Sequence, residues 1–144
     1  MIDTNRLPHA TLFSGLEGGN VLLEAYYMLG YLMCEDRQPE GPCMKCRQCK
    51  RIQKWMHPDV NLVLPTFDSK QGSSDVIGKW REFTEDRDFF TYEDWSVFMD
   101  AGKNPNINRK QTEAVMQSYR LKPYEGGNKV FFVWGVEFLG KESN

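Results

Sequence analysis

Apolar residues form three short runs along the chain that predict β-strands. The strongest run spans 129–136 and is apolar almost throughout, as expected for a central strand covered on both faces of a parallel sheet. A second strand is expected at 60–64, before Pro65, and a short buried strand at 10–14.

Other stretches have apolar residues at helical spacing. Between 21 and 34 these residues share one face, which predicts a helix with Asn20 as its N-cap. Because strands alternate with helices, the sequence predicts an α/β layered fold. The further helices are expected at 46–56, 76–87, 92–101 and 109–121, the last of them capped by Asn108.

Aromatic residues are concentrated in and between the two helices expected in the middle of the chain. Aromatic side chains at helical spacing are typical of a core, and a contact with a partner protein is the alternative. The residues are Trp80, Phe83, Phe89, Phe90, Tyr92, Trp95 and Phe98.

The length of 144 residues favours one domain, and an apolar content of 40% is enough for a packed core. The net charge of −2 argues neither for nor against a polyanionic partner. A basic segment between Cys43 and Lys54 contains no acid, which fits either a solvated helix face or a DNA contact. Its basic residues are Lys45, Arg47, Lys50, Arg51 and Lys54.

The sequence gives no indication of a membrane or secreted protein. No apolar stretch is long enough to span a bilayer, and the early charges of Asp3 and Arg6 do not fit a secretory signal. We therefore expect a cytoplasmic protein, and in that compartment four cysteines favour a metal site over disulfides.

The four cysteines follow the spacing C-x8-C-x2-C-x2-C. Four thiolates complete one tetrahedral Zn²⁺ with no open position, so the predicted site is structural rather than catalytic. Four incidental or partly oxidised thiols are the alternative, and His57 is expected to have a structural role rather than to replace a cysteine. The predicted ligands are Cys34, Cys43, Cys46 and Cys49.

A glycine-containing loop separates the strand expected at 10–14 from the following helix, which is the order of a phosphate-binding loop. Such a loop needs a lysine for the phosphate charge and a hydroxyl for Mg²⁺. Asn20, Val21 and Leu22 stand at the second glycine, the lysine and the hydroxyl, so the chemistry of the loop is lost. The degenerate loop comprises Gly15, Gly18, Gly19, Asn20, Val21 and Leu22.

The strand expected at 129–136 also lacks the acid that would hold Mg²⁺ at its end. Trp134 and Gly135 occupy that position, and Glu137 comes too late. With lysine, hydroxyl and acid all absent, we expect no catalytic residues, no ATP cofactor and no ATP hydrolysis. The alternative is that this segment was never a phosphate loop.

Several stretches carry a combined resemblance to a known family. They are 6–15 (RLPHATLFSG), the four cysteines, 57–60 (HPDV) and 121–130 (LKPYEGGNKV). In this order they resemble the bacterial clamp-loader AAA+ subunits, delta-prime and gamma/tau of DNA polymerase III. The missing lysine and acid favour delta-prime, because gamma subunits keep both.

The resemblance implies a P-loop NTPase-like AAA+ core with a parallel sheet. Residues 1–144 would be a truncated first AAA+ domain, an N-terminal fragment with a zinc module at about 34–57. The segment at about 66–108 is longer than in typical family members and is expected to be an insertion.

The resemblance also implies a function. The chain would be part of a non-catalytic subunit that helps a clamp loader place the sliding clamp on primed DNA, within a polymerase holoenzyme that is itself a nucleotidyltransferase. Its partners would be the gamma/tau and delta subunits, with the clamp and DNA reached through the complex. The alternatives are a working gamma-type ATPase and a zinc-centred DNA-binding module.

Overall fold

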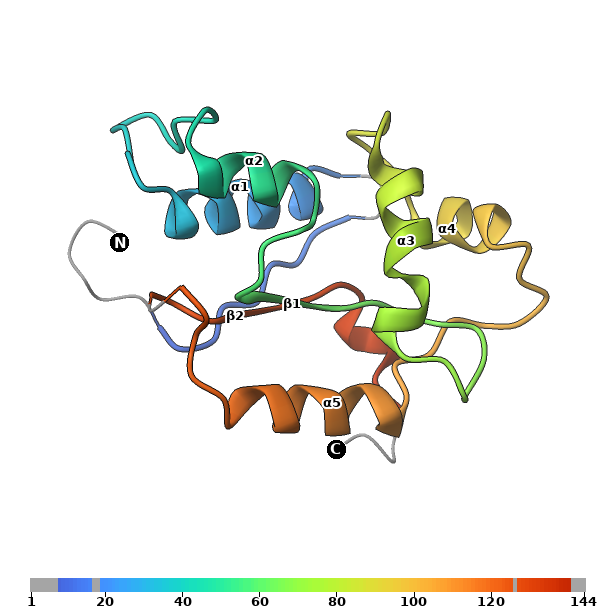
Figure 1. Ribbon diagram of the computed structural model, residues 1–144. Coiled ribbons are helices and arrows are strands. Elements are labelled where there is room, and N and C mark those ends of the chain that lie inside the picture. The colour runs from blue at the N-terminus through green and yellow to red at the C-terminus, as the bar shows by residue number, and fades with distance from the viewer. Residues whose placement is uncertain (1–7, 17–18, 126, 141–144) are drawn as a thin grey trace.

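The computed structural model describes residues 8–16, 19–125 and 127–140. These residues form a small parallel sheet with helices around it (Figure 1). The elements are α1 (Val21–Met33), α2 (Arg47–Gln53), β1 (Val60–Val63), α3 (Ser73–Thr84), α4 (Tyr92–Phe98), α5 (Arg109–Tyr119), β2 (Val130–Val133) and the 3-10 helix η1 (Val136–Phe138). Within these ranges no helix is both long and apolar enough to cross a bilayer.

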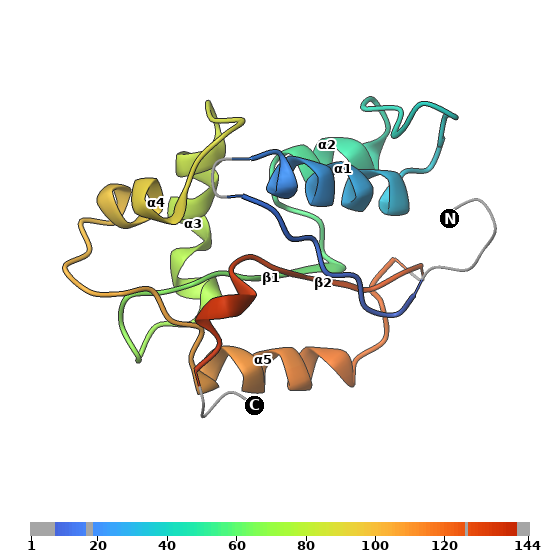
Figure 2. The same cartoon turned by 180° about the vertical axis from the view of Figure 1, so that it is seen from behind.

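The sheet consists of β1 and β2, which pair in parallel with Val60 opposite Val130 and Val63 opposite Val133. Helices α1 and α2 lie on one side of the two strands and α5 lies on the other, as both views show (Figures 1 and 2). The predicted α/β class, the parallel pairing and both of these strands are therefore confirmed.

The strand expected at 10–14 is not present. These residues have no regular secondary structure, and the side chain of Leu12 is 74% exposed. An apolar run becomes a strand only where its backbone finds a neighbouring strand and its side chains find a core. Among the described residues, 10–14 pair with no strand, and within this stretch only Phe13 is partly buried, so this prediction was wrong.

The helices follow the predicted order, with boundaries set by their capping interactions. α5 begins after Asn108, whose side chain accepts a hydrogen bond from the backbone N–H of Gln111, as predicted. α3 begins earlier than expected because Asp75 accepts a 2.7 Å hydrogen bond from the N–H of Gly72. Asn20 does precede α1, but its side chain makes no capping hydrogen bond.

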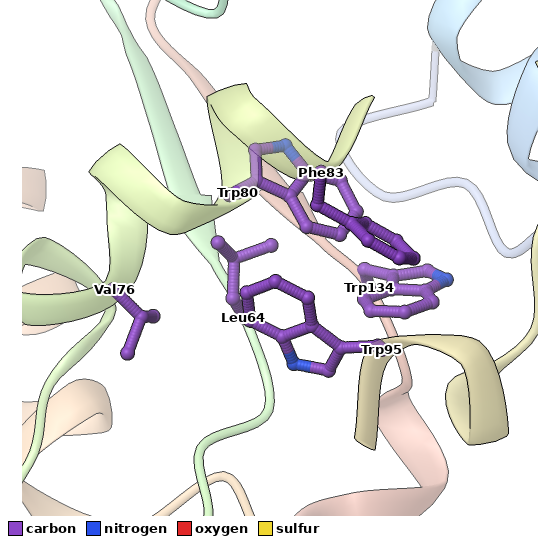
Figure 3. Close-up of a cluster of buried hydrophobic side chains, with 6 residues drawn as sticks. All are labelled: Leu64, Val76, Trp80, Phe83, Trp95 and Trp134. Atoms are coloured by element: carbon purple, nitrogen blue, oxygen red, sulfur yellow. The ribbon is translucent and has the colours of Figure 1, made fainter. Parts of the chain in front are cut away.

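The main core is an aromatic cluster at the carboxyl ends of the two strands. Trp80 lies at its centre, with ring centroids 4.9 Å from Trp134, 5.7 Å from Trp95 and 6.2 Å from Phe83. Figure 3 shows these rings directed toward one another beside Leu64. The predicted core role of the aromatic helices is thus confirmed for Trp80, Phe83 and Trp95.

A smaller apolar cluster holds α1 and α2 against the sheet. It contains Leu29 of α1, Ile52 of α2 and Phe132 of β2. Trp55 packs against both clusters, with its ring 5.4 Å from Phe132 and 5.6 Å from Trp80. Trp55 therefore joins the two clusters, together with Leu22 and Leu62.

The segment carrying α3 and α4 leaves the sheet and returns to the same point. Thr66 and Asn106 exchange two backbone hydrogen bonds, of 2.9 and 2.8 Å. The side chain of Asn108 adds a 2.7 Å bond to the carbonyl of Gln71. The helices α3 and α4 therefore lie within a long connecting segment whose two ends are hydrogen-bonded to each other.

Replacing Trp80 tests the importance of the aromatic cluster. Trp80→Ala should lower the free energy of unfolding by about 3–5 kcal/mol, because it removes a fully buried ring and leaves a cavity. Phe89→Ala is the matched control: Phe89 is 58% exposed, so the loss should be less than about 1 kcal/mol. Urea unfolding followed by far-UV circular dichroism measures both. Equal losses would contradict this account of the core.

Candidate functional site

The four cysteines lie together at the junction of α1 and α2. Their sulfur atoms all lie within 4.8 Å of one another. Cys34 follows the last residue of α1, Cys46 precedes the first residue of α2, and Cys49 lies within α2. Two helix ends and the loop containing Cys43 therefore bring the predicted set into one cluster.

The loop between the helices is held in shape by α1. The hydroxyl of Tyr27 donates a 2.6 Å hydrogen bond to the carbonyl of Glu40. Gly41 has φ of 148°, and a Cβ there would lie 1.6 Å from the hydroxyl oxygen of Tyr27, so only glycine fits this turn. Met44, with φ of 59°, makes the next turn between Cys43 and Cys46.

Backbone N–H groups surround the sulfur atoms. The Sγ of Cys34 accepts from the N–H of Cys43 at 3.3 Å, and the Sγ of Cys43 accepts from the N–H of Cys46 at 3.3 Å. The Sγ of Cys46 in turn accepts from the N–H of Cys49 at 3.4 Å. Such donors stabilise thiolates, the form in which cysteine binds metals.

The thiol pKa values differ within the cluster. Burial raises the pKa of Cys46, but hydrogen bonds from the backbone of Cys49 and of Glu35 outweigh it and bring the pKa to about 7. Burial, followed by hydrogen bonds with Cys46 and Cys34, raises the pKa of Cys49 well above its ordinary value. Cys46 is therefore more readily deprotonated than Cys49, and a metal that binds the set must displace the proton of Cys49.

The cluster has the donor set and the compactness of a metal site. Tetrahedral zinc with sulfur at about 2.3 Å needs sulfur–sulfur separations of roughly 3.8 Å, and the four sulfur atoms already lie within 4.8 Å of one another. The four cysteines can therefore hold a metal ion such as zinc. His57 is not part of the cluster, and its Nδ1 accepts a 3.1 Å hydrogen bond from the N–H of Asp59.

The HPDV and PYEG stretches contact each other directly. Asp59 is 1% exposed, and its two carboxylate oxygens accept the backbone N–H groups of Tyr124 and Glu125. Burial lowers the pKa of His57, so its ring is neutral near pH 7 and can accept the N–H of Asp59. These bonds position the loop before β2 against the turn before β1.

The same loop neutralises part of the basic segment. Glu125 accepts hydrogen bonds from Arg51 at 2.6 Å and from Arg47 at 2.8 Å. In the part of the chain that the structure describes, Lys45, Lys50 and Lys54 make no ion pair. The predicted basic segment thus divides into two groups. Two arginines fix the cysteine module, which is α2 with the four clustered cysteines, to the loop of Glu125. The three lysines are solvated.

Apolar side chains that follow the glycine loop pack against its backbone and against the core. A Cβ at Gly15 would lie 2.5 Å from a methyl carbon of Val21, so the valine lies against the loop backbone. Leu22 packs against both apolar clusters. The N–H of Gly19 bonds the carbonyl of Leu16 at 3.0 Å. Gly18, which the sequence places in the loop, falls outside the described residues.

Trp134 lies at the carboxyl end of β2, where an ATP-hydrolysing sheet would carry its metal-binding acid. It is 8% exposed, and its ring stacks on Tyr92 with centroids 4.3 Å apart. The backbone N–H of Trp134 donates to the carbonyl of Val63 at 3.0 Å, which continues the pairing of β2 with β1. Aromatic rings from α3 and α4 therefore cover the strand ends.

Sequence reasoning missed two of these arrangements. It predicted an aromatic core but did not place that core over the strand ends. It quoted HPDV and PYEG as separate stretches but did not predict that Asp59 binds the backbone at Glu125. A buried aspartate needs hydrogen-bond donors or a cation as partners, but the sequence alone does not identify them.

Comparison with known proteins identifies the family. The family profile described as "DNA polymerase III, delta subunit" matches residues 1–144. The chain belongs to this family. This confirms the resemblance to DNA polymerase III subunits.

Two relatives are both named DNA polymerase III subunit delta'. The protein from Bacillus subtilis (strain 168) is 42% identical over 64 residues, which is 44% of this chain and 19% of that protein. The protein from Yersinia pestis is 34% identical over 62 residues, which is 43% of this chain and 18% of that protein. The matched stretches thus span less than a fifth of either relative.

The anchoring role of Glu125 in this family member predicts a pH dependence. The hydrogen bond from Arg51 is the largest influence and, with the charge of Arg47, holds the pKa of Glu125 below its ordinary value of 4.5. Because the folded pKa is the lower one, the stabilisation is present above about pH 4.5 and is lost as the pH falls through the folded pKa.

Glu125→Gln should therefore be less stable than the unaltered chain near neutral pH, and this gap should shrink below about pH 4.5. Urea unfolding across the pH range measures the gap. In an Arg51→Ala background, the gap near neutral pH should be smaller. A gap that is unchanged down to pH 3 would show that the carboxylate charge is not what holds the loop.

Proposed function

We propose that this chain is part of a non-catalytic subunit of the DNA polymerase III clamp loader. The observation that carries the proposal is Trp134, whose buried ring occupies the end of β2. In ATP-hydrolysing sheets of this type, an acid at that position reaches Mg²⁺. A tryptophan packed on Tyr92 offers no metal ligand.

The glycine loop, which would form the other half of a nucleotide site, supports the same proposal. A phosphate loop presents free backbone N–H groups and a lysine to the phosphates. Here Val21 lies against Gly15, and Leu22 is packed into the core. Lys129 cannot substitute, because its amine donates to the carbonyls of Ser118 and Leu121 at 2.9 and 2.8 Å. A degenerate phosphate loop accounts for all of these features.

We further propose that residues 1–144 form part of an AAA+ domain in which 66–108 is an insertion. The paired backbones of Thr66 and Asn106 support this, because removing what lies between them would leave the sheet and α5 connected. The aromatic rings of the insertion then fill the space at the strand ends. The insertion would thus stabilise a domain that no longer holds a nucleotide there.

The cysteine cluster is proposed to hold a structural Zn²⁺, within a module of about 34–57. Cys34, Cys43, Cys46 and Cys49 would supply all four ligands, leaving no position for a reactive water. The ion would fix the end of α1 to the start of α2. Its contribution is therefore to folding and not to a reaction.

As a clamp-loader subunit, the protein would act in the cytoplasm with gamma/tau and delta subunits. It would reach the sliding clamp and primed DNA through the assembled complex, and its role would be to support the ATP sites of other subunits. Direct DNA binding through the basic segment is disfavoured, because Arg47 and Arg51 are engaged by Glu125.

Calorimetric titration with ATP tests the proposal. We expect no Mg²⁺-dependent binding at micromolar ATP, because the lysine, the hydroxyl and the acid are replaced by Val21, Leu22 and Trp134. A Val21→Lys variant should not restore binding, since the other two replacements remain. Micromolar, Mg²⁺-dependent binding by the unaltered chain would refute the inactive site.

Metal analysis tests the zinc site separately. The purified chain should contain about one zinc per molecule, and Cys46→Ser should lower the affinity for zinc in competition with a chromophoric chelator. Met44→Asn is the matched control: it lies in the same loop, keeps four thiols and suits a positive φ. If Cys46→Ser retained zinc as tightly as the control, the four-cysteine site would be wrong.

A further inference from the structure

β1 has one edge that does not face β2. At the two ends of the parallel ladder, the carbonyls of Asp59 and Val63 accept hydrogen bonds from β2 and from Trp134 just after it. In a parallel ladder, alternate residues of a strand bond to the same neighbour. The backbone groups of Val60 and Leu62 therefore point away from β2.

This outer edge is partly satisfied at its two ends and not in the middle. At one end, the N–H of Leu64 donates to the hydroxyl of Ser73 at 3.0 Å, and its carbonyl accepts from the side chain of Gln111. At the other end, the N–H of Val60 donates to the carbonyl of His57 at 3.2 Å. Between them, the N–H and C=O of Leu62 have no partner among the described residues.

A groove of about 460 Å³ runs along this edge. Its walls come from α3, α5 and the turn before β1, and all four residues of β1 line its floor. In Figure 1, α3 lies to the right of β1 and α5 lies below it. Four strand residues extend over roughly 13 Å, so the groove suits a short extended segment. The lining includes Trp55, Ile77, Arg81, Lys110 and Ala114.

The groove carries an excess of positive charge at Arg81. Arg81 and Lys110 line it, and none of its described lining residues is Asp or Glu. Lys110 is paired at 3.0 Å with Asp75, which lies outside the lining. Arg81 donates to the carbonyl of Trp55 at 2.9 and 3.2 Å and has no carboxylate partner in the described ranges. α5 begins at the groove with no acid in its first turn, so its N-terminus adds partial positive charge.

We propose that the free edge of β1 binds an extended acidic peptide as an added strand. One peptide residue would pair its C=O and N–H with the N–H and C=O of Leu62, as in β-strand addition. A carboxylate of the peptide would reach Arg81, and a small apolar side chain would pack on Ala114. This binding surface is separate from the proposed loss of nucleotide binding and does not depend on it.

Fluorescence anisotropy with a labelled peptide tests the proposal. The probe is a fluorescein-labelled peptide of about eight residues that alternates valine with aspartate, and a valine–lysine peptide is the charge control. The acidic peptide should bind, and the basic one should bind at least tenfold more weakly. Equal binding of the two peptides, or no binding of the acidic peptide at millimolar chain, would overturn the proposal.

Two pairs of variants locate the peptide. Ala114→Phe should weaken binding at least tenfold by filling the groove, whereas Met116→Phe, on an exposed position of α5 outside it, should not. Arg81→Ala should weaken binding about two- to fivefold, the range of a partly exposed ion pair, and Lys79→Ala on the same helix should not. Equal effects within either pair would place the peptide elsewhere.

The unaltered chain gives an independent readout. When the acidic peptide saturates the protein, the amide of Leu62 should shift in the NMR spectrum and exchange more slowly with solvent. Methylating the peptide amides of one alternating set should abolish binding, and methylating the other set should not. An unperturbed Leu62 amide would contradict strand addition. Dimerisation that Ala114→Phe abolishes would identify a second copy as the occupant and refute the peptide.

Discussion

The contact between Trp80 and Trp134 is the interaction on which the rest of the structure most depends. Two parallel strands of four residues have little stability by themselves and need cover on their faces and ends. Trp134 extends β2 by one hydrogen bond to β1, and its ring then enters the cluster around Trp80. The sheet and the helices at 66–108 are thereby buried against each other.

The same contact bears on function. In an active nucleotide-binding sheet, the carboxyl ends of the strands stay polar and open, because ligands bind in the crevice outside them. In this chain buried rings fill that space, and Trp134 stands at the end of β2. The non-catalytic subunit proposed above would need a rigid domain and no open site. Under that proposal, the packing of these rings stabilises the domain without loss of function.

A second anchor acts at the opposite end of the strands. The buried carboxylate of Asp59 fixes the backbone of the loop before β2, and Glu125 of that loop fixes Arg51 of α2. Because α2 also carries Cys46 at its start and Cys49 within it, this chain of contacts ties the cysteine module to the sheet. The module is thus oriented from two sides, by the sulfur cluster and by the arginines.

The sequence predicted those features whose signal is local. The periodicity of apolar residues identified β2 and the helices, and the spacing of the cysteines identified their cluster. Each of these signals depends on residues that lie close together in the chain. Whether residues 10–14 form a strand could not be predicted this way, since strand pairing depends on a distant neighbour. The hydrogen bond that the N–H of Glu125 donates to Asp59 spans 66 positions, and no local pattern encodes it. The free edge of β1 arises from which groups remain unpaired once the other elements have packed.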